Sequence, residues 1–235
     1  MRPKLSPIPP LSAIDKHVWK LAPNGRFSVK TFYNFLNDGG IHCHKTNVIL
    51  KGGCPKKINL FNWLAWDNKI LTLDNLDSRK CNVLPTPTCV MCHAGMETAE
   101  HLLIHCPMAS YIWTYFSQLL GIRCSPRSLT DLWGDCRRSI PKILLPSWDL
   151  LLKAITWVIW LERNARIFTA SCLLTVALIL KIEHLVLSWF SAAPESKRAK
   201  LEDPMAKVKR SLEYLSSSDA IPVAPAERSP PPGEM

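Results

Sequence analysis

The 235-residue sequence contains no apolar run long enough to span a membrane. Its longest uncharged stretch near the C-terminus, residues 167–180, has 14 residues, whereas a transmembrane helix needs about 20. The first 15 residues contain four prolines and lack the apolar stretch of a secretory signal. We therefore expect no membrane association and a reducing intracellular compartment, either the nucleus or the cytoplasm.

Acidic residues are scarce relative to basic ones. The sequence has 29 Lys and Arg against 19 Asp and Glu, a net charge of +10, of which residues 1–80 carry +8 and residues 191–235 carry none. Such an excess favours a polyanionic partner such as nucleic acid. The candidate phosphate contacts are Lys56, Lys57, Arg79 and Lys80, with Trp63 and Trp66 between the two pairs. The alternative is a solvated basic face over a core that uses both tryptophans.

The nine cysteines do not fit a secreted disulfide scaffold, because their number is odd and no secretory signal precedes them. In a reducing compartment, thiols in a regular pattern are typical of metal binding. The strongest pattern is C-x2-C-x8-H-x4-C, formed by Cys89, Cys92, His101 and Cys106. Sulfur and nitrogen ligands suit Zn²⁺ better than Ca²⁺ or Mg²⁺, so these four residues are predicted to bind zinc in a tetrahedral site.

The fourth ligand has an alternative. His105 lies four residues after His101 and would share its helix face, whereas Cys106 would lie about 140° around an ideal helix from His101. Cys106 can therefore ligate only if the helix unwinds there, and Pro107 supports such an unwinding. We favour Cys106. Because four protein ligands leave no open position for water, the pattern predicts a structural zinc and no enzyme.

The other cysteines and histidines show no comparable pattern. His42, Cys43 and His44 are adjacent and cannot readily face one ion together with Cys54, so no second metal site is predicted. The remaining cysteines lack paired spacing and are interpreted as small buried hydrophobic residues: Cys81, Cys124, Cys136 and Cys172. Glu97 and Glu100 are the carboxylates nearest to the predicted ligands that could serve as a base.

The spacing of apolar residues predicts a mainly α fold, a small zinc-stabilised helical domain followed by a pair of long helices. A turn signal at residues 23–25 favours a short N-terminal β-hairpin, although Ser28 could instead cap a helix. Further helices are predicted at 58–65, after a Thr72 cap, at 107–120 between Pro107 and Gly121, at 147–168 and at 171–190.

The changes in composition along the chain predict five segments. These are a Pro-rich extended N-terminus (1–14), a zinc-binding domain (15–121), a linker (122–146), a helical pair (147–190) and a mostly disordered C-terminal tail with one weak helix at 205–215 (191–235).

Several motifs occur in the same order as in a known family. They lie at residues 15–19, 24–33, 55–65 and 71–76, and continue through Arg79, Cys89, Cys92, residues 97–102, Cys106 and Trp113. With these motifs the sequence resembles the zinc-binding domain that follows the reverse transcriptase in plant non-LTR (LINE-type) retrotransposons. Residues 160–168 resemble the segment that often follows this domain.

The sequence also departs from that family. Residues 48–53 stand where the family usually has a Trp-containing stretch. The Tyr-x-Asp-Asp signature of the polymerase is missing, and no carboxylate set for two-metal nuclease chemistry is evident. The chain therefore resembles a stand-alone C-terminal fragment of such an element.

The resemblance implies a non-catalytic zinc-binding module of a retrotransposon polyprotein that binds RNA or target DNA through its basic surface. A further candidate partner is a reverse transcriptase supplied in trans, which a protein-interaction surface would bind. One alternative is a zinc-stabilised protein-interaction module without nucleic-acid binding, which an exposed apolar patch around Trp157, Trp160 and Trp189 would favour. Another is a relic open reading frame with no retained role.

Overall fold

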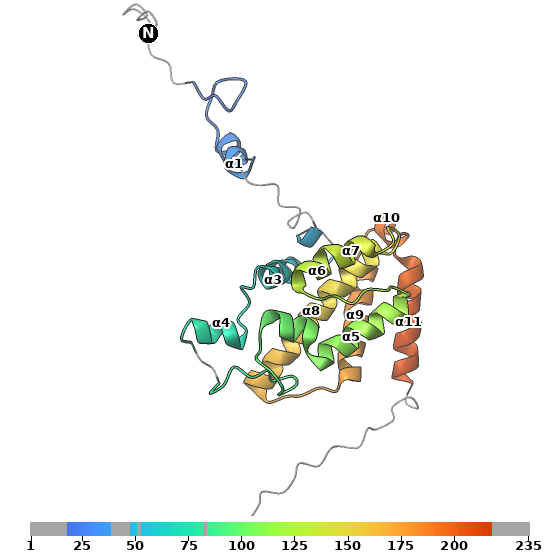
Figure 1. Cartoon of the computed structure of the whole chain (residues 1–235). Helices are drawn as coiled ribbons and strands as arrows, with labels where there is room; N and C mark the ends of the chain where they lie inside the picture. Colours follow the sequence, from blue (N-terminus) through green and yellow to red (C-terminus); the bar gives the residue numbers. More distant parts are fainter. Residues whose placement is uncertain (1–17, 39–47, 51–52, 82–83, 218–235) are drawn as a thin grey trace, which may run out of the picture. The chain divides into compact units, whose positions relative to one another are not determined.

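The computed structural model describes residues 18–38, 48–50, 53–81 and 84–217 (Figure 1). The chain divides into two compact units, Met1–Cys43 and His44–Met235, which are described separately. Helices dominate both, so the mainly α fold class is confirmed. Apart from a single antiparallel bridge between Thr88 and Met96, the described residues contain no β-structure. None of their helices has the length and apolar character needed to cross a membrane.

Among the described residues of the first unit, 18–38, the chain forms helix α1 (Val29–Asp38) after the turn where a β-hairpin was predicted. The hairpin prediction is wrong because the chain enters a helix directly after its turn. The turn itself forms as expected: Trp19 N–H donates to the Gly25 carbonyl at 2.8 Å, and Gly25 adopts a φ of 65°. Ser28 then caps α1, its Oγ accepting from the Thr31 N–H at 3.1 Å, as the alternative interpretation anticipated.

The second unit is built from helices that mostly match the predicted ones. The helix predicted between Pro107 and Gly121 has the expected bounds, and Gly121 closes it with a left-handed φ of 68°. The elements are α3 (Lys56–Trp66), α4 (Leu73–Ser78), η1 (His101–His105), α5 (Pro107–Leu120), α6 (Leu129–Trp133), α7 (Asp135–Ser139), α8 (Leu145–Thr169), α9 (Thr175–Ser191), α10 (Glu195–Arg198) and α11 (Glu202–Ser216).

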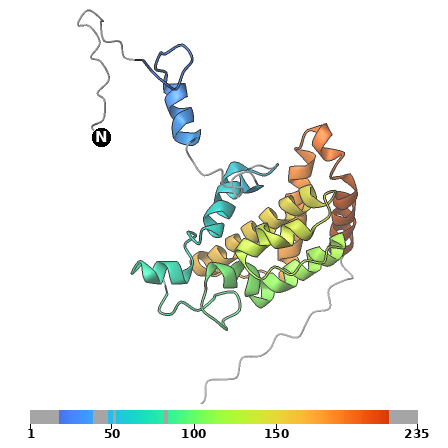
Figure 2. The same cartoon turned by 45° about the horizontal axis from the view of Figure 1, so that its top comes forward.

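Helix α8 is the axis of this unit. It packs against α3, α5, α9 and η1, so most of its circumference is covered by other helices (Figure 2). Trp148, Leu151 and Ile155 on α8 are fully buried. A helix that is apolar on nearly all sides belongs in a core, and α8 occupies the core of this unit.

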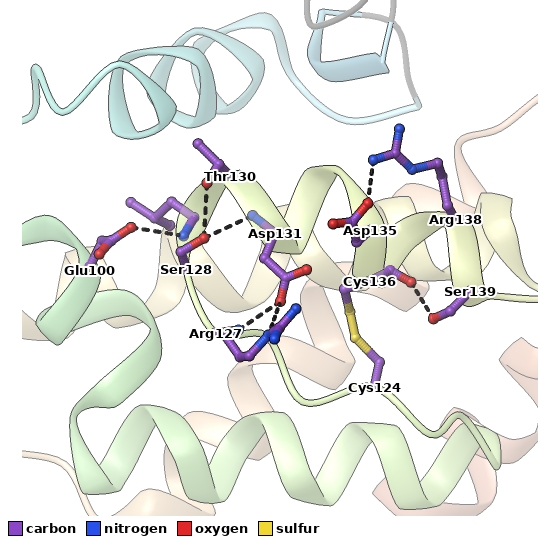
Figure 3. Close-up of polar contacts among 11 residues, drawn as sticks. Glu100, Cys124, Arg127, Ser128, Thr130, Asp131, Asp135, Cys136, Arg138 and Ser139 are labelled. Carbon is purple, nitrogen blue, oxygen red and sulfur yellow. Dashed lines mark hydrogen bonds and ion pairs between the residues drawn. A yellow bond between two sulfur atoms is a disulfide. The ribbon is translucent and has the colours of Figure 1, made fainter.

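Residues 122–146, predicted as a linker, contain two short helices instead. Leu129, Leu132 and Trp133 of α6 are buried in the core of the unit. Ser128 caps α6 by accepting from the Asp131 N–H at 3.0 Å, and the Glu100 carboxylate accepts from the Leu129 N–H at 3.4 Å (Figure 3). The prolines and polar residues of this stretch concealed its few large apolar side chains, which are enough to fold it onto α3 and its neighbours.

The interpretation of four cysteines as buried hydrophobic residues is wrong. Cys124 and Cys136 form a disulfide, with their Cα atoms 5.7 Å apart, that joins the end of α5 to α7 (Figure 3). Cys81 and Cys172 are exposed. The pairing was hidden because residues between Cys124 and Cys136 fold back through α6, which a separation of 12 residues does not reveal.

In the C-terminal segment 191–235, the structure describes residues up to 217. The weak helix predicted at 205–215 is part of α11, which packs on α5 and α9. Leu201, Met205 and Val208 are buried in that contact. The remaining tail, residues 218–235, lies outside the described residues, as does the Pro-rich segment 1–14.

Candidate metal centre

Four side chains predicted as zinc ligands converge in the second unit. Cys89, Cys92, His101 and Cys106 each present one ligand atom, and these four atoms all lie within 4.8 Å of one another. The Cys92 Sγ and the His101 Nε2 are 3.2 Å apart. In the part of the chain that the structure describes, no other group of three or more His, Cys, Asp or Glu side chains is close enough to hold a metal ion.

A tight loop presents the first two cysteines. Its ends are joined by the Cys89 N–H, which donates to the Gly95 carbonyl at 2.7 Å, and by the Thr88–Met96 bridge. Within the loop, the His93 N–H donates to the Cys89 carbonyl at 2.8 Å, and His93 takes a left-handed φ of 56°. This turn brings the two thiols of a C-x2-C pair to the same side, as zinc binding requires.

The second ligand pair lies on η1, a π-helical turn. Thr98 fixes its start, as predicted for a cap, because its Oγ1 accepts from the His101 N–H at 3.0 Å. The Cys106 N–H donates to the His101 carbonyl at 2.6 Å. This i→i+5 bond is the mark of a π-turn, which holds one more residue than an α-turn and so stacks Cys106 over His101.

The π-turn explains the choice of the fourth ligand. An α-helix would have stacked His105 over His101, whereas in the structure His105 is exposed and Cys106 is buried within the cluster. Cys106 leaves the helical conformation with a ψ of 132°. The following Pro107 disfavours the α conformation for the residue before it, and this is the unwinding that the sequence suggested.

The chemistry of the donor set fits zinc. Three thiols and one imidazole are the ligands of a Cys3His structural site. Burial, followed by the nearby His105, lowers the pKa of His101, which favours the neutral imidazole that can bind a metal. The pKa of Cys106 is lowered, first because the Cys89 side chain hydrogen-bonds to it, and the same bond raises the pKa of Cys89.

A buried ion pair supports the segment between the two ligand pairs. The side chains of Glu97 and Arg163 are 0% and 2% exposed. Glu97 Oε1 accepts from Arg163 Nε at 2.9 Å, from Arg163 Nη2 at 2.7 Å and from the Leu73 N–H at 3.0 Å. Its Oε2 is buried without a hydrogen-bond partner. Glu97 therefore joins α4 and α8 to residues 88–106, which carry the four ligands and which we call the zinc segment. It is not free to act as a base at the cluster.

A second arginine of α8 holds the loop between the first two cysteines. Arg166 Nη1 donates to the carbonyls of Val90 and Met91, at 3.3 and 3.2 Å. Its Nε donates to Glu162 Oε1 at 2.9 Å, an ion pair that is almost completely buried. Since Val90 and Met91 are the two residues between Cys89 and Cys92, Arg166 fixes the backbone that carries both thiols.

No role was predicted for Arg163 and Arg166, although both lie in residues 160–168, which resemble the segment that often follows the zinc-binding domain. The available signal was the i, i+3 spacing of Arg163 and Arg166, which places both on one face of a helix. Two arginines on one face of an otherwise apolar helix indicate partners in another element, and those partners are the carboxylate and carbonyls of the zinc segment.

The four candidate phosphate contacts are exposed but belong to different elements. Lys56 and Lys57 begin α3, while Arg79 and Lys80 follow α4. The Lys57 Nζ lies 5.7 Å from the centroid of the Trp157 ring. The two tryptophans between the pairs, Trp63 and Trp66, are half-buried against the core, as the alternative interpretation anticipated.

The apolar patch that would favour a protein-interaction module is not formed by the three tryptophans proposed for it. Trp157 and Trp160 pack on Phe61 of α3, with ring centroids 5.3 and 5.6 Å apart. Trp189 is only 7% exposed. Trp189 therefore belongs to the core, and Trp157 and Trp160 are half-buried against it.

Comparison with known proteins agrees with the geometry. Residues 27–113 match a family described as zinc-binding in reverse transcriptase. An Arabidopsis thaliana protein named "putative ribonuclease H protein" is 26% identical over 170 residues, which are 66% of this chain and 26% of that protein. The chain thus spans about a quarter of this relative's length. No solved structure matches. The resemblance to the zinc-binding domain of reverse transcriptases is therefore confirmed for residues 27–113, which carry all four candidate ligands.

Proposed function

We propose that the chain is a non-catalytic, retrotransposon-derived module in which Cys89, Cys92, His101 and Cys106 bind one structural Zn²⁺ and a basic surface binds RNA or DNA. The observation that carries the proposal is the convergence of exactly the donor set of a closed zinc site. Four protein ligands fill a tetrahedral zinc, so no position is left for a catalytic water. The bound ion supplies a cross-link between the cysteine loop and the π-turn.

The residues of the chain prepare this cross-link. Arg166 holds the carbonyls of the cysteine loop, and Thr98 fixes the start of the π-turn that carries His101 and Cys106. The Glu97–Arg163 pair connects both parts to α8. A zinc ion bound here would therefore stabilise the packing of the zinc segment on the central helix, and zinc-binding free energy becomes folding free energy.

Nucleic-acid binding is the second half of the proposal. It is supported by the net charge of +10 and by the exposed Lys56, Lys57, Arg79 and Lys80. The relative named for ribonuclease H, an activity on RNA, and the reverse-transcriptase context of the matched family support the same partner class. We place the protein in the nucleus or cytoplasm, because Cys89, Cys92 and Cys106 are free and must stay reduced to bind zinc. The Cys124–Cys136 disulfide is the feature that argues against this placement, since disulfides are uncommon in these compartments.

Metal analysis combined with a salt-titrated binding assay tests both halves. Protein purified under reducing, chelator-free conditions should carry one zinc per chain, and Cys92→Ser should lower that content. The logarithm of the affinity for a short single-stranded RNA or DNA should fall linearly with the logarithm of the salt concentration. The slope reflects the number of phosphates contacted. Replacing Lys56, Lys57, Arg79 and Lys80 together by Gln should reduce this slope.

Each half can fail separately. Protein that carries no metal under these conditions would overturn the zinc site. Binding whose log affinity barely changes with log salt would overturn the nucleic-acid surface and would favour a protein-interaction module or a reverse transcriptase supplied in trans as the partner.

A further inference from the structure

A cavity of about 530 Å³ lies beside the N-terminal half of α8. Its walls come from α7, α8, α9, α10 and the residues that flank them. The volume is within the usual range of small-ligand sites. From Lys153 at this cavity to Arg166 at the zinc segment, α8 rises by about 20 Å, at about 1.5 Å per residue. The cavity is therefore separate from the metal centre.

The lining is strongly basic. Five cationic side chains and a single carboxylate line it: Arg137, Lys142, Lys153, Lys197, Lys200 and Asp149. Asp149 is engaged by Arg137, whose Nε and Nη2 donate to its two carboxylate oxygens at 2.7 and 2.9 Å. That pair cancels its own charge, so the lysines leave the described lining with a net charge of +4.

Lys153 places one of these charges inside the protein. Its side chain is among the largest fully buried ones, with a residue exposure of 1%, and its Nζ lies 6.0 Å from the Trp133 ring centroid. Burial lowers the pKa of Lys153, which shows that its cationic form has lost much of its hydration. A cation in this position interacts strongly with an anion in the cavity, because the dielectric around it is low.

The remaining lining is apolar, with Leu145, Leu150, Trp189 and Leu201 among its residues. A ligand that fits both parts carries a phosphate next to a flat or apolar group, as a nucleotide does. The basic surface also continues past this cavity. A neighbouring cavity of about 700 Å³ shares Lys142 and Lys200 and adds Lys207 and Arg210, together with two carboxylates. Consecutive basic hollows can follow the phosphates of a strand.

We propose that this cavity binds the phosphate of a nucleotide unit, with Lys142, Lys197 and Lys200 at the phosphate and the apolar wall at the rest of the nucleotide. The source is either a nucleic-acid strand or a free mononucleotide. The first source rests on the proposed function, but the binding site is independent of both the zinc ligands and the four basic residues assigned above.

Two triple variants of the zinc-loaded full chain test the site. One changes Lys142, Lys197 and Lys200 to Gln, and the matched control changes Lys20, Lys30 and Lys181, which are exposed and outside both proposed binding surfaces, to Gln. Both remove three exposed positive charges, so nonspecific attraction falls equally. Calorimetric titration with adenosine monophosphate should show affinity about tenfold weaker in the first variant and nearly unchanged in the control. Thermal unfolding confirms that both variants remain folded.

The outcomes distinguish a nucleic-acid strand from a free mononucleotide as the ligand, and failure of the cavity site from failure of the proposed function. Competition of the monophosphate by a short single-stranded oligonucleotide supports a strand as the ligand, and its absence supports a free nucleotide. Equal losses in both triple variants, or no measurable binding of adenosine monophosphate, would overturn the cavity site. If the oligonucleotide binds and only the variant of Lys56, Lys57, Arg79 and Lys80 weakens it, the cavity proposal fails while the proposed function stands.

Discussion

The two halves of α8 lie among groups of different net charge. In the C-terminal half, Arg163 and Arg166 each have a carboxylate within 3 Å, Glu97 and Glu162, and further donors reach the zinc segment. In the N-terminal half, the lining of the 530 Å³ cavity holds five cations against the single carboxylate of Asp149. One end of α8 thus lies in a cluster of paired charges, and the other end lines a cavity whose described side chains, most of them from neighbouring segments, are mainly cationic.

This difference indicates what each end does. A buried charge with a well-placed partner fixes one arrangement of the chain, since breaking the pair leaves the other charge buried alone. Positive charge in excess within a hollow raises the potential there and attracts an anion. We therefore interpret the C-terminal half of α8 as the support of the metal centre and the N-terminal half as a binding surface.

Loss of the metal ion should have the largest effect on the molecule. Structural zinc sites contribute on the order of 10–16 kcal/mol of metal-binding free energy. Cys92→Ser should therefore lower the melting temperature of the zinc-loaded protein strongly and free the loop around Cys89 for reaction with thiol reagents. Differential scanning calorimetry and thiol labelling measure both effects. The matched control is Cys172→Ser, at an exposed cysteine outside the cluster, which should leave the melting temperature and the labelling of Cys89 unchanged and remove only the label on Cys172 itself.

Removal of the buried Glu97–Arg163 ion pair should have the next largest effect on stability. Arg163→Met leaves Glu97 buried without its partner, so the free energy of unfolding should fall by about 3–5 kcal/mol in urea denaturation. Arg138→Met removes an ion pair to Asp135 whose side chains are 75% and 70% exposed, and it should cost less than about 0.5 kcal/mol. Equal costs for the two variants would contradict the structural role of the buried pair.

The second arginine should act on metal affinity as well as on global stability, because its loss also leaves the buried Glu162 without its ion-pair partner. Arg166→Gln removes donors from the Val90 and Met91 carbonyls without touching a ligand. Loss of such an outer contact costs about 10–100-fold in metal affinity, which chelator competition measures. Arg127→Gln is the control, because this 84% exposed arginine pairs with Asp131 of α6 (Figure 3). An unchanged zinc affinity in Arg166→Gln would show that the loop holds its shape without this support.

The ligand set was predictable from the sequence because it is local. The four ligands lie within 18 residues, and Pro107 marks the place where the helix must unwind for Cys106 to join them. The longer helices α3, α5, α8 and α9 were predictable for the same reason, since their apolar spacing and their Pro and Gly boundaries are short-range signals, whereas α6, α7 and α10 were not predicted.

Long-range features could not be predicted. The Glu97–Arg163 pair joins residues 66 positions apart, and only the packing of α8 on the zinc segment brings them together. The Cys124–Cys136 disulfide depends on how α6 folds back, and the basic cavity gathers residues from α7 to α10. The N-terminal hairpin failed for a local reason: its turn signal was correct, but the Ser28 cap directed the chain into α1 instead of a second strand.

The smallest expected change, Lys153→Met, tests the other side of the comparison. This substitution removes a buried cation whose desolvation opposes folding, so the free energy of unfolding at neutral pH should change by less than about 1 kcal/mol.

The charged and titratable groups acting on Lys153 are Cys54, Asp149 and Arg137. Because burial lowers the folded-state pKa of Lys153 below its usual 10.5, the unfolded chain binds more protons than the folded one in the interval between the two values. The stability of the wild type relative to Lys153→Met should therefore rise with pH across that alkaline interval, as measured by urea denaturation of both proteins at a series of pH values. A loss of unfolding free energy as large as that of Arg163→Met, or a difference between the two proteins that does not depend on pH, would contradict this prediction. It would show that Lys153 stabilises the fold as the buried Arg163 does.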